Sequence, residues 1–234
     1  MPTDTSRDPL TVISSMATRH VLTQLAQAYE AASGQRVSIV PVGGVEAARR
    51  IQEGERSDVV VLACDALDRL ERNGHIIAAS RVGVARSEVA VAVKHGEPRR
   101  DVSSESAVRD AVLRARTIGY STGPSGTHIV NLLRQWGIAD VIADRIVEAR
   151  PGVPVGSLVA EGTVELGFQQ LSELVHEPGI DIVGMLPAAI QAVTVFSAAI
   201  CASSEQQEAA KALLNHLVSA DGNEVKIAHG MAPV

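Results

Sequence analysis

Short runs of aliphatic and β-branched residues alternate along the chain with segments whose apolar positions recur every three to four residues. The first run, 10–14, precedes a segment at 21–32 with helical periodicity, which Gly34 ends. The same order repeats at 37–42 and at 58–62, each followed by another helical pattern. Strands that alternate with helices in this way are typical of parallel α/β construction.

The pattern changes after about residue 80, where alternating valines replace the strand-then-helix order. From there on we predict strands at 117–120, 164–168, 180–185 and 193–200, and helices at 108–115, 127–136, 140–148 and 205–218, with a short helix after the Pro-Gly-Val-Pro-Val turn at 151–155.

The chain is long enough for two lobes, but no segment rich in Gly, Ser or Pro separates them. We therefore expect strands to run from one lobe into the other, at about 82–88 and 190–197. The predicted division is lobe 1 at 1–84 and 196–234, and lobe 2 at 85–195. A ligand is then expected in the cleft between the lobes.

Composition narrows the function classes. Aromatic residues make up only 2% of the chain and the net charge is −6, so neither stacking platforms nor a basic surface favours nucleic-acid binding. No apolar run approaches the roughly 18 residues of a membrane helix, so we expect no membrane insertion. The polar start, 1–9, predicts a cytoplasmic protein as the sequence stands, and a periplasmic one if a signal peptide was removed.

Residues suited to anion binding recur where a predicted strand ends and a helix begins. Helix N-termini offer free N–H groups to an anion, and Gly-Gly lets the backbone approach closely or form an anion-binding nest. The same residue types are also ordinary helix caps, but their recurrence favours a ligand cradle. The candidates are Ser14, Ser15, Gly43, Gly44, Ser125, Gly126, Thr127, Val153 and Val155.

The order of these motifs resembles the type 2 periplasmic-binding-protein fold, and within it the molybdate-binding-protein-like group. The resemblance rests on strand–Ser-Ser–helix, strand–Gly-Gly–helix, the Ser-Asp-Val-Val-Val-Leu strand at 57–62, the Pro-x-Gly helix start at 124–126 and the closing segment at 209–230. It extends from about Leu10 to Met231. It implies two α/β lobes, each a mostly parallel sheet flanked by helices, with an oxyanion held by the helix starts.

Two positions depart from the molybdate binders of that group. Gln170, next to Gln169, stands where they usually have a tyrosine, and His128 stands at a commonly aromatic position. A glutamine amide both donates and accepts, which suits a carboxylate better than a compact oxyanion. The group also includes aconitate isomerases, so His128 is a candidate acid/base for moving a proton on an unsaturated polycarboxylate. A solvent-facing histidine on the first helical turn is the alternative.

Three functions follow as hypotheses. The first is an isomerase, aconitate isomerase-like, that binds a small di- or tricarboxylate anion and uses neither a metal nor a cofactor. The second is the receptor of an ABC importer for molybdate or a similar oxyanion, with the ABC permease as its partner. The third is a cytoplasmic ligand sensor, which needs a partner because no DNA-binding helix-turn-helix accompanies it.

Overall fold

The computed structural model describes residues 8–234, and residues 1–7, which enter the location prediction, lie outside the described part. The chain divides into two compact units: unit 1 extends to Ala85 and resumes with Val195–Ala228 and Pro233–Val234, and unit 2 contains Arg86–Thr194 and His229–Ala232. The chain therefore passes from one unit to the other inside two strands, β4 (Val82–Lys94) and β9 (Val193–Ile200).

The predicted return segment, 196–234, does not lie wholly in unit 1. His229–Ala232 belong to unit 2, because Ala232 pairs with Arg86 of β4 through two backbone hydrogen bonds of 2.8 Å. The Ser87 hydroxyl also donates to the Gly230 carbonyl at 3.4 Å.

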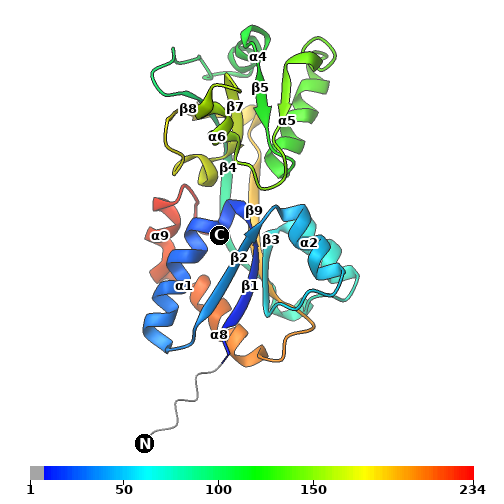
Figure 1. Cartoon of the computed structure of the whole chain (residues 1–234), viewed down its shortest axis with the longest axis vertical. Coiled ribbons are helices and arrows are strands. Elements are labelled where there is room, and N and C mark those ends of the chain that lie inside the picture. Colours follow the sequence, from blue (N-terminus) through cyan, green and yellow to red (C-terminus); the bar gives the residue numbers. More distant parts are fainter. Residues whose placement is uncertain (1–7) are drawn as a thin grey trace, which may run out of the picture. The chain divides into compact units, whose positions relative to one another are not determined.

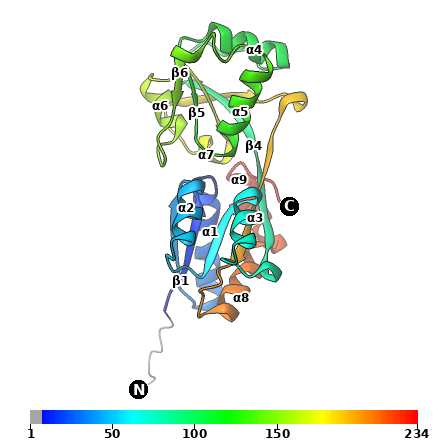
Figure 2. The same ribbon diagram turned by 90° about the vertical axis from the view of Figure 1, so that its right-hand side faces the viewer.

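Unit 1 is a sheet in the order β2-β1-β3-β9, in which β1 is parallel to β2 and β3, and β9 is antiparallel to β3. Helices α1, α8 and α9 cover one face of this sheet, and α2 and α3 lie side by side on the other (Figures 1 and 2). The elements are β1 (Leu10–Ser15), α1 (Arg19–Ser33), β2 (Val37–Val42), α2 (Gly44–Gln52), β3 (Val59–Ala63), α3 (Cys64–Arg72), α8 (Gln207–Leu217) and α9 (Asn223–Ala228).

Unit 2 is a mixed sheet in which β5 is parallel to β6 and β7, whereas β4 is antiparallel to β7 and β8. Apolar side chains of α4 and α5 pack on one face of the sheet, and those of α6 and α7 pack on the other. The elements are α4 (Glu105–Arg114), β5 (Ile118–Tyr120), α5 (Pro124–Gln135), β6 (Ile146–Glu148), α6 (Val155–Glu161), β7 (Leu166–Gln170), α7 (Leu171–Leu174) and β8 (Ile180–Met185).

The predicted α/β class is confirmed, and the core is aliphatic as the composition indicates. The crossing strand β9 and the strands around β4 supply the antiparallel pairs, so the sheets are mixed. Only four aromatic side chains are buried among the described residues: Tyr29, Tyr120, Phe168 and Phe196.

The predicted helix at 140–148 is wrong. A 3₁₀ turn at Ala143–Arg145 leads into strand β6, which pairs with β5 in parallel. Ile146 and Val147 are β-branched, which favours a strand, and the edge of β5 supplies hydrogen-bond partners for them. The sequence pattern of this segment alone does not show that such an edge is available. Tertiary pairing therefore overrides the local periodicity here.

Candidate functional site

The carboxyl edge of the parallel strands in unit 1 gathers the first group of predicted residues. β1 ends at Ser15, β2 at Val42 and β3 at Ala63. Because these strands are parallel, their carboxyl ends share one edge of the sheet, and α2 and α3 begin there. A Cβ built on Gly44 would lie 3.8 Å from Ser15 Oγ, so these two predicted residues are neighbours.

Ser14 lies on the other face of the sheet. Successive strand residues point to opposite faces, so Ser14 shares the face of Val12, and Ser15 shares that of Ile13. Ser14 is fully buried, and its hydroxyl oxygen has no hydrogen-bond partner among residues 8–234. The hydroxyl of Ser15 accepts a weak hydrogen bond from Ala17 N at 3.4 Å. The structure thus brings Ser15, but not Ser14, beside the start of α2.

The glycines before α2 do not form the anion-binding nest that Gly-Gly suggests. Gly43 has φ −59° and ψ 139°, and neither Gly43 nor Gly44 has a positive φ. A nest needs left-handed backbone at one of two successive residues. The donors that remain are the N–H groups of the first turn of α2, which has no side-chain cap. Among the described residues, a Cβ on Gly43 would meet nothing within 4 Å.

The first turn of α2 also carries a negative group, Glu46, that would oppose a bound anion. Arg49 donates to its carboxylate at 2.7 and 2.9 Å, and Arg50 donates at 2.8 Å. Hydrogen bonds from Arg49 and then Arg50 lower the pKa of Glu46 to about 2. The carboxylate is therefore ionised but compensated, and both guanidinium groups are already engaged on the helix surface.

The carboxyl edge of the parallel strands in unit 2 gathers the second group. β5 ends at Tyr120, β6 at Glu148 and β7 at Gln170, and β5 is parallel to both neighbours. The loops that follow β5 and β6 lead into α5 and α6 at this same edge. The predicted residues of unit 2 lie on these loops, on the first turns of the helices or at the end of β7.

The start of α5 is built around Gly126. A Cβ at this position would lie 1.5 Å from the Ser121 carbonyl oxygen, so only glycine fits against the loop. Ser125 is buried, with its hydroxyl 3.3 Å from that of Ser121, and the exposed Thr127 hydroxyl donates to the Gly123 carbonyl at 3.3 Å. Pro124 has no N–H, which leaves the N–H groups of Ser125 and Gly126 as the first-turn donors without a carbonyl partner inside the helix.

His128 is fixed by one hydrogen bond. Its Nε2 lies 2.7 Å from the carbonyl oxygen of Ile190, in the 3₁₀ turn Ala188–Ile190. A carbonyl only accepts, so Nε2 carries the proton and the lone pair of the neutral ring is on Nδ1. The ring is partly buried.

Gln169, Val153 and Val155 have internal partners in place of a ligand. Gln169 is buried, and its Oε1 accepts hydrogen bonds from Val155 N at 2.9 Å and Gly156 N at 3.3 Å. Its Nε2 donates to Glu173 Oε1 at 2.8 Å. The Val153 N–H bonds to a backbone carbonyl of its own turn at 3.0 Å. Gln169 therefore caps α6 from the end of β7, and the backbone N–H groups of Val153 and Val155 are already hydrogen-bonded within unit 2.

Gln170 keeps one polar atom unpaired. The side chain is 1% exposed, and its Nε2 donates to Thr194 Oγ1 at 2.8 Å. Its Oε1 is buried with no hydrogen-bond partner among the described residues. Gln170 thus remains a candidate for contact with a ligand, and Thr194 is a partner that the sequence did not indicate.

Sequence reasoning also missed two other polar groups at these edges. Cys64 is the first residue of α3, and its sulfur lies 3.4 Å from Ser197 Oγ of β9. Ser121 supports the α5 loop through Ser125 and the Gly123 N–H. Ser121 belongs to the same Ser-Thr-Gly-Pro-Ser-Gly run and could have been found, whereas the Cys64–Ser197 contact depends on how β3 and β9 pair.

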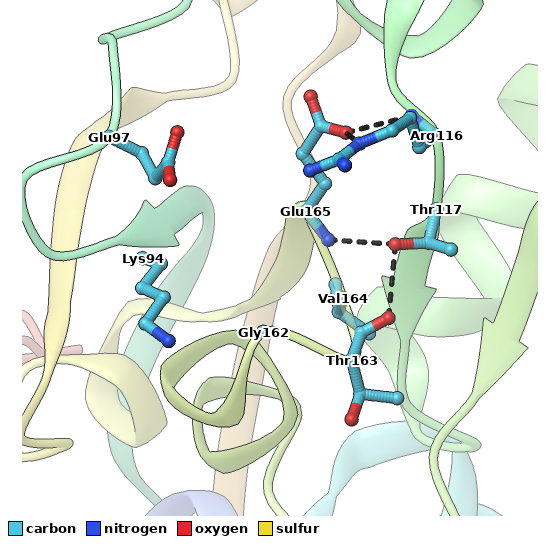
Figure 3. A pocket seen from close by; sticks show the side chains of 8 residues that line it. All are labelled: Lys94, Glu97, Arg116, Thr117, Gly162, Thr163, Val164 and Glu165. Carbon is cyan, nitrogen blue, oxygen red and sulfur yellow. Dashed lines mark hydrogen bonds and ion pairs between the residues drawn. The ribbon is translucent and has the colours of Figure 1, made fainter.

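A cavity of about 230 Å³ lies away from these residues, where β5 and β7 begin (Figure 3). Lys94 and Glu97 face it from one side, and on the other Glu165 accepts hydrogen bonds from Arg116 and from Arg100. Burial alone raises the pKa of Glu165, but the hydrogen bonds with Arg116 and Arg100 outweigh it and lower the pKa overall. The cavity contains none of the predicted site residues.

Within residues 8–234, no group of three or more His, Cys, Asp or Glu side chains is arranged to hold a metal ion. Nor does this part of the chain include a helix that is both long and apolar enough to cross a membrane.

The sequence from residue 10 to 232 matches the model of the family described as bacterial extracellular solute-binding protein. The chain belongs to this family. This solute-binding protein is 36% identical over 230 residues to an aconitate isomerase of a Pseudomonas species, covering 96% of this chain and 88% of the relative. It is 27% identical over 218 residues to the molybdate-binding protein ModA of Azotobacter vinelandii, covering 88% and 82%.

The fold of this solute-binding protein matches a solved structure of the molybdate-binding-protein-like group. The periplasmic molybdate-binding protein of Azotobacter vinelandii superposes with a TM-score of 0.80 at 22% identity, covering 96% of this chain and 99% of the other. The resemblance to the molybdate-binding-protein-like group is therefore confirmed.

Proposed function

We propose that this solute-binding protein isomerises an unsaturated tricarboxylate, with aconitate as the first substrate to test, and uses no metal or organic cofactor. The observation that carries the proposal is the 36% identity to an aconitate isomerase over 96% of the chain. The hydrogen bond between His128 Nε2 and the Ile190 carbonyl, and the Gln170 amide, of which only one end is hydrogen-bonded, support it from the structure.

The reaction needs one proton to move. In cis-aconitate a methylene group lies next to a carboxylate and to the double bond, so its hydrogens are acidic. A base removes one of them, the double bond shifts by one carbon, and a proton is delivered to the carbon that was vinylic. The product is again aconitate, and the new double bond can have the trans geometry. General acid–base catalysis of such a step typically contributes about 10²–10⁴-fold.

The residues divide these tasks in the proposal. N–H groups of the first turn of α5 bind a carboxylate, as helix N-termini commonly do. Nδ1 of His128 takes the proton, because Nε2 is committed to the Ile190 carbonyl. The same N–H donors stabilise the negative charge that develops when the proton leaves.

The binding role is tested by two conservative variants. Ser15→Ala removes a hydroxyl at the end of β1, and Thr127→Val removes one in the first turn of α5. Each variant is expected to weaken ligand binding by about 1–3 kcal/mol, as for a lost hydrogen bond to a charged group. Calorimetry with trans-aconitate measures the change. Unchanged affinity in both variants would reduce these residues to the local caps that their hydrogen bonds already describe.

The catalytic role is tested at His128. His128→Gln keeps a side-chain N–H that can reach the Ile190 carbonyl but has no nitrogen with a free lone pair. Turnover of cis-aconitate, followed by chromatography in the presence of a chelator, is expected to fall by about two to four orders of magnitude, with little change in binding. His128→Ala serves as the second variant. Full activity in both would remove His128 from the mechanism.

A receptor function in an ABC importer is the second candidate, supported by the family's description as extracellular solute-binding and by the ModA relative. In that case the ABC permease is the partner, and tight molybdate or tungstate binding without turnover is the expected result. The family description also favours a location outside the cytoplasm over the cytoplasmic one predicted from the sequence as it stands, and cell fractionation distinguishes them.

A further inference from the structure

We infer that Thr194 is a positioning residue that allows the Gln170 amide to turn its N–H group toward a carboxylate ligand. The inference rests on the proposed function, because it assumes a carboxylate ligand at the carboxyl edge of unit 2. It depends on four side chains of that unit, Gln170, Thr194, Gln191 and His128, and on the backbone of Val89.

Val89 of β4 lies between the strand that carries Gln170 and the segment that leads to Thr194. On one edge it pairs with Gln170 in the antiparallel ladder of β4 and β7. Its N–H donates to Gln191 Oε1 at 2.9 Å, and its carbonyl accepts from Gln191 Nε2 at 3.1 Å and from Leu186 N at 3.0 Å. Gln191 is three residues before Thr194, so Val89 contacts β7 at Gln170 on one edge and the segment that leads to Thr194 on the other.

The same segment also holds His128. Ile190, which accepts the hydrogen bond from the His128 ring, directly precedes Gln191. Gln191 makes further hydrogen bonds to Leu186 O at 3.1 Å and Ala192 N at 2.9 Å, which fix the segment at several points. The segment 190–194 therefore contacts both the proposed base, through Ile190, and the candidate ligand amide, through Thr194.

The amide of Gln170 is only half satisfied as it stands. Nε2 donates to Thr194 Oγ1, while the buried Oε1 has no partner among residues 8–234. An unpaired buried carbonyl oxygen is unfavourable and repels a carboxylate. Turning the amide by 180° about its last bond exchanges the two atoms: Oε1 then accepts from the Thr194 hydroxyl, and Nε2 is free to donate to a carboxylate.

A hydroxyl group makes both states possible because it donates and accepts equally well. In the first state Thr194 accepts from Nε2, and in the second it donates to Oε1. A valine side chain of nearly the same shape can do neither. Thr194 is thus the residue that makes a hydrogen-bonded N–H available to the ligand without leaving Oε1 unpaired.

The experiment measures binding of tricarballylate, a saturated tricarboxylate that cannot isomerise, to the full chain by calorimetry. Thr194→Val is expected to weaken binding by about tenfold or more, the range for a hydrogen bond to a charged group, while Thr194→Ser keeps the hydroxyl and stays within about threefold of the wild type. Thr23→Val, which removes an exposed hydroxyl on α1, is the matched control and is expected to change nothing.

A second readout does not depend on the variants folding. In the wild type, the side-chain amide resonances of Gln170 are expected to shift strongly when tricarballylate is added, as the NH₂ group changes partner from hydroxyl to carboxylate. Equal affinity in Thr194→Val and wild type, or Gln170 resonances that do not move on saturation, overturns the inference and leaves the proposed function standing. A wild type that binds no tricarboxylate overturns both.

Discussion

Replacing Gln169 by leucine tests whether this residue holds the fold or the ligand. In the structure its Oε1 accepts hydrogen bonds from the N–H groups of Val155 and Gly156, and its Nε2 donates to Glu173. Leucine has a similar size and fills the same buried space. The substitution therefore leaves two N–H groups of α6 without an acceptor, at a place where both residues are buried.

The magnitude follows from those two donors. An unsatisfied buried group costs about 1–3 kcal/mol, so Gln169→Leu is expected to destabilise unit 2 by about 2–5 kcal/mol, partly offset by the apolar surface of leucine. In urea this corresponds to a midpoint lowered by roughly 1 M or more. Trp136 is the sole tryptophan and belongs to unit 2, so its fluorescence reports on this unit directly.

Gln135→Leu makes the same chemical change at an exposed position of α5 in unit 2, and is expected to change the free energy of unfolding by less than about 0.5 kcal/mol. A Gln169→Leu variant that unfolds at the wild-type urea concentration but no longer binds a tricarboxylate would refute the capping role. That result would make Gln169 a ligand contact, as the sequence predicts, and not a helix cap.

Three further predictions follow from other contacts. Gly126→Ala is expected to destabilise unit 2 and abolish ligand binding, because its Cβ would overlap the loop carbonyl 1.5 Å away; a wild-type melting curve would contradict this. Burial raises the pKa of the Cys201 thiol to about 12, so native protein at pH 8 is expected to show one fast-reacting thiol, Cys64, and one that reacts only on unfolding. The lowered pKa of Glu165 stabilises the fold above its unfolded value of about 4.3, and this contribution is lost as pH falls through the lower folded value. Glu165→Gln is therefore expected to lower the urea midpoint at pH 7, and this deficit is expected to shrink as the pH falls below about 4.3. A deficit that stays constant with pH would contradict the sign.

Much of the fold could be predicted because hydrophobic periodicity and strong breakers coincide. The strands at 37–42, 180–185 and 193–200 have the predicted bounds, and Gly34 ends α1 in the left-handed conformation. β6 could not be predicted, because its strand character comes from the free edge of β5 and not from its own three residues.

The candidate site could be predicted only at the level of its edges. The carboxyl ends of parallel strands lie at the same edge of a sheet. The predicted strand order therefore brings Ser15 close to Gly44, and the candidate site residues of unit 2 close to one another. Which polar atoms remain free is decided by tertiary hydrogen bonds. Gln169 and Gln170 are adjacent and identical in type, yet one caps α6 and the other keeps an unpaired oxygen.

The most direct test of the account is the fate of a label in the substrate. Purified protein is incubated with cis-aconitate carrying two deuterium atoms on its methylene carbon, with a chelator present, and the product is analysed by NMR. Proton transfer predicts trans-aconitate in which the labelled carbon has become vinylic and keeps one deuterium. A product whose labelled carbon is still a fully deuterated methylene, or no product at all, would contradict the proposed chemistry.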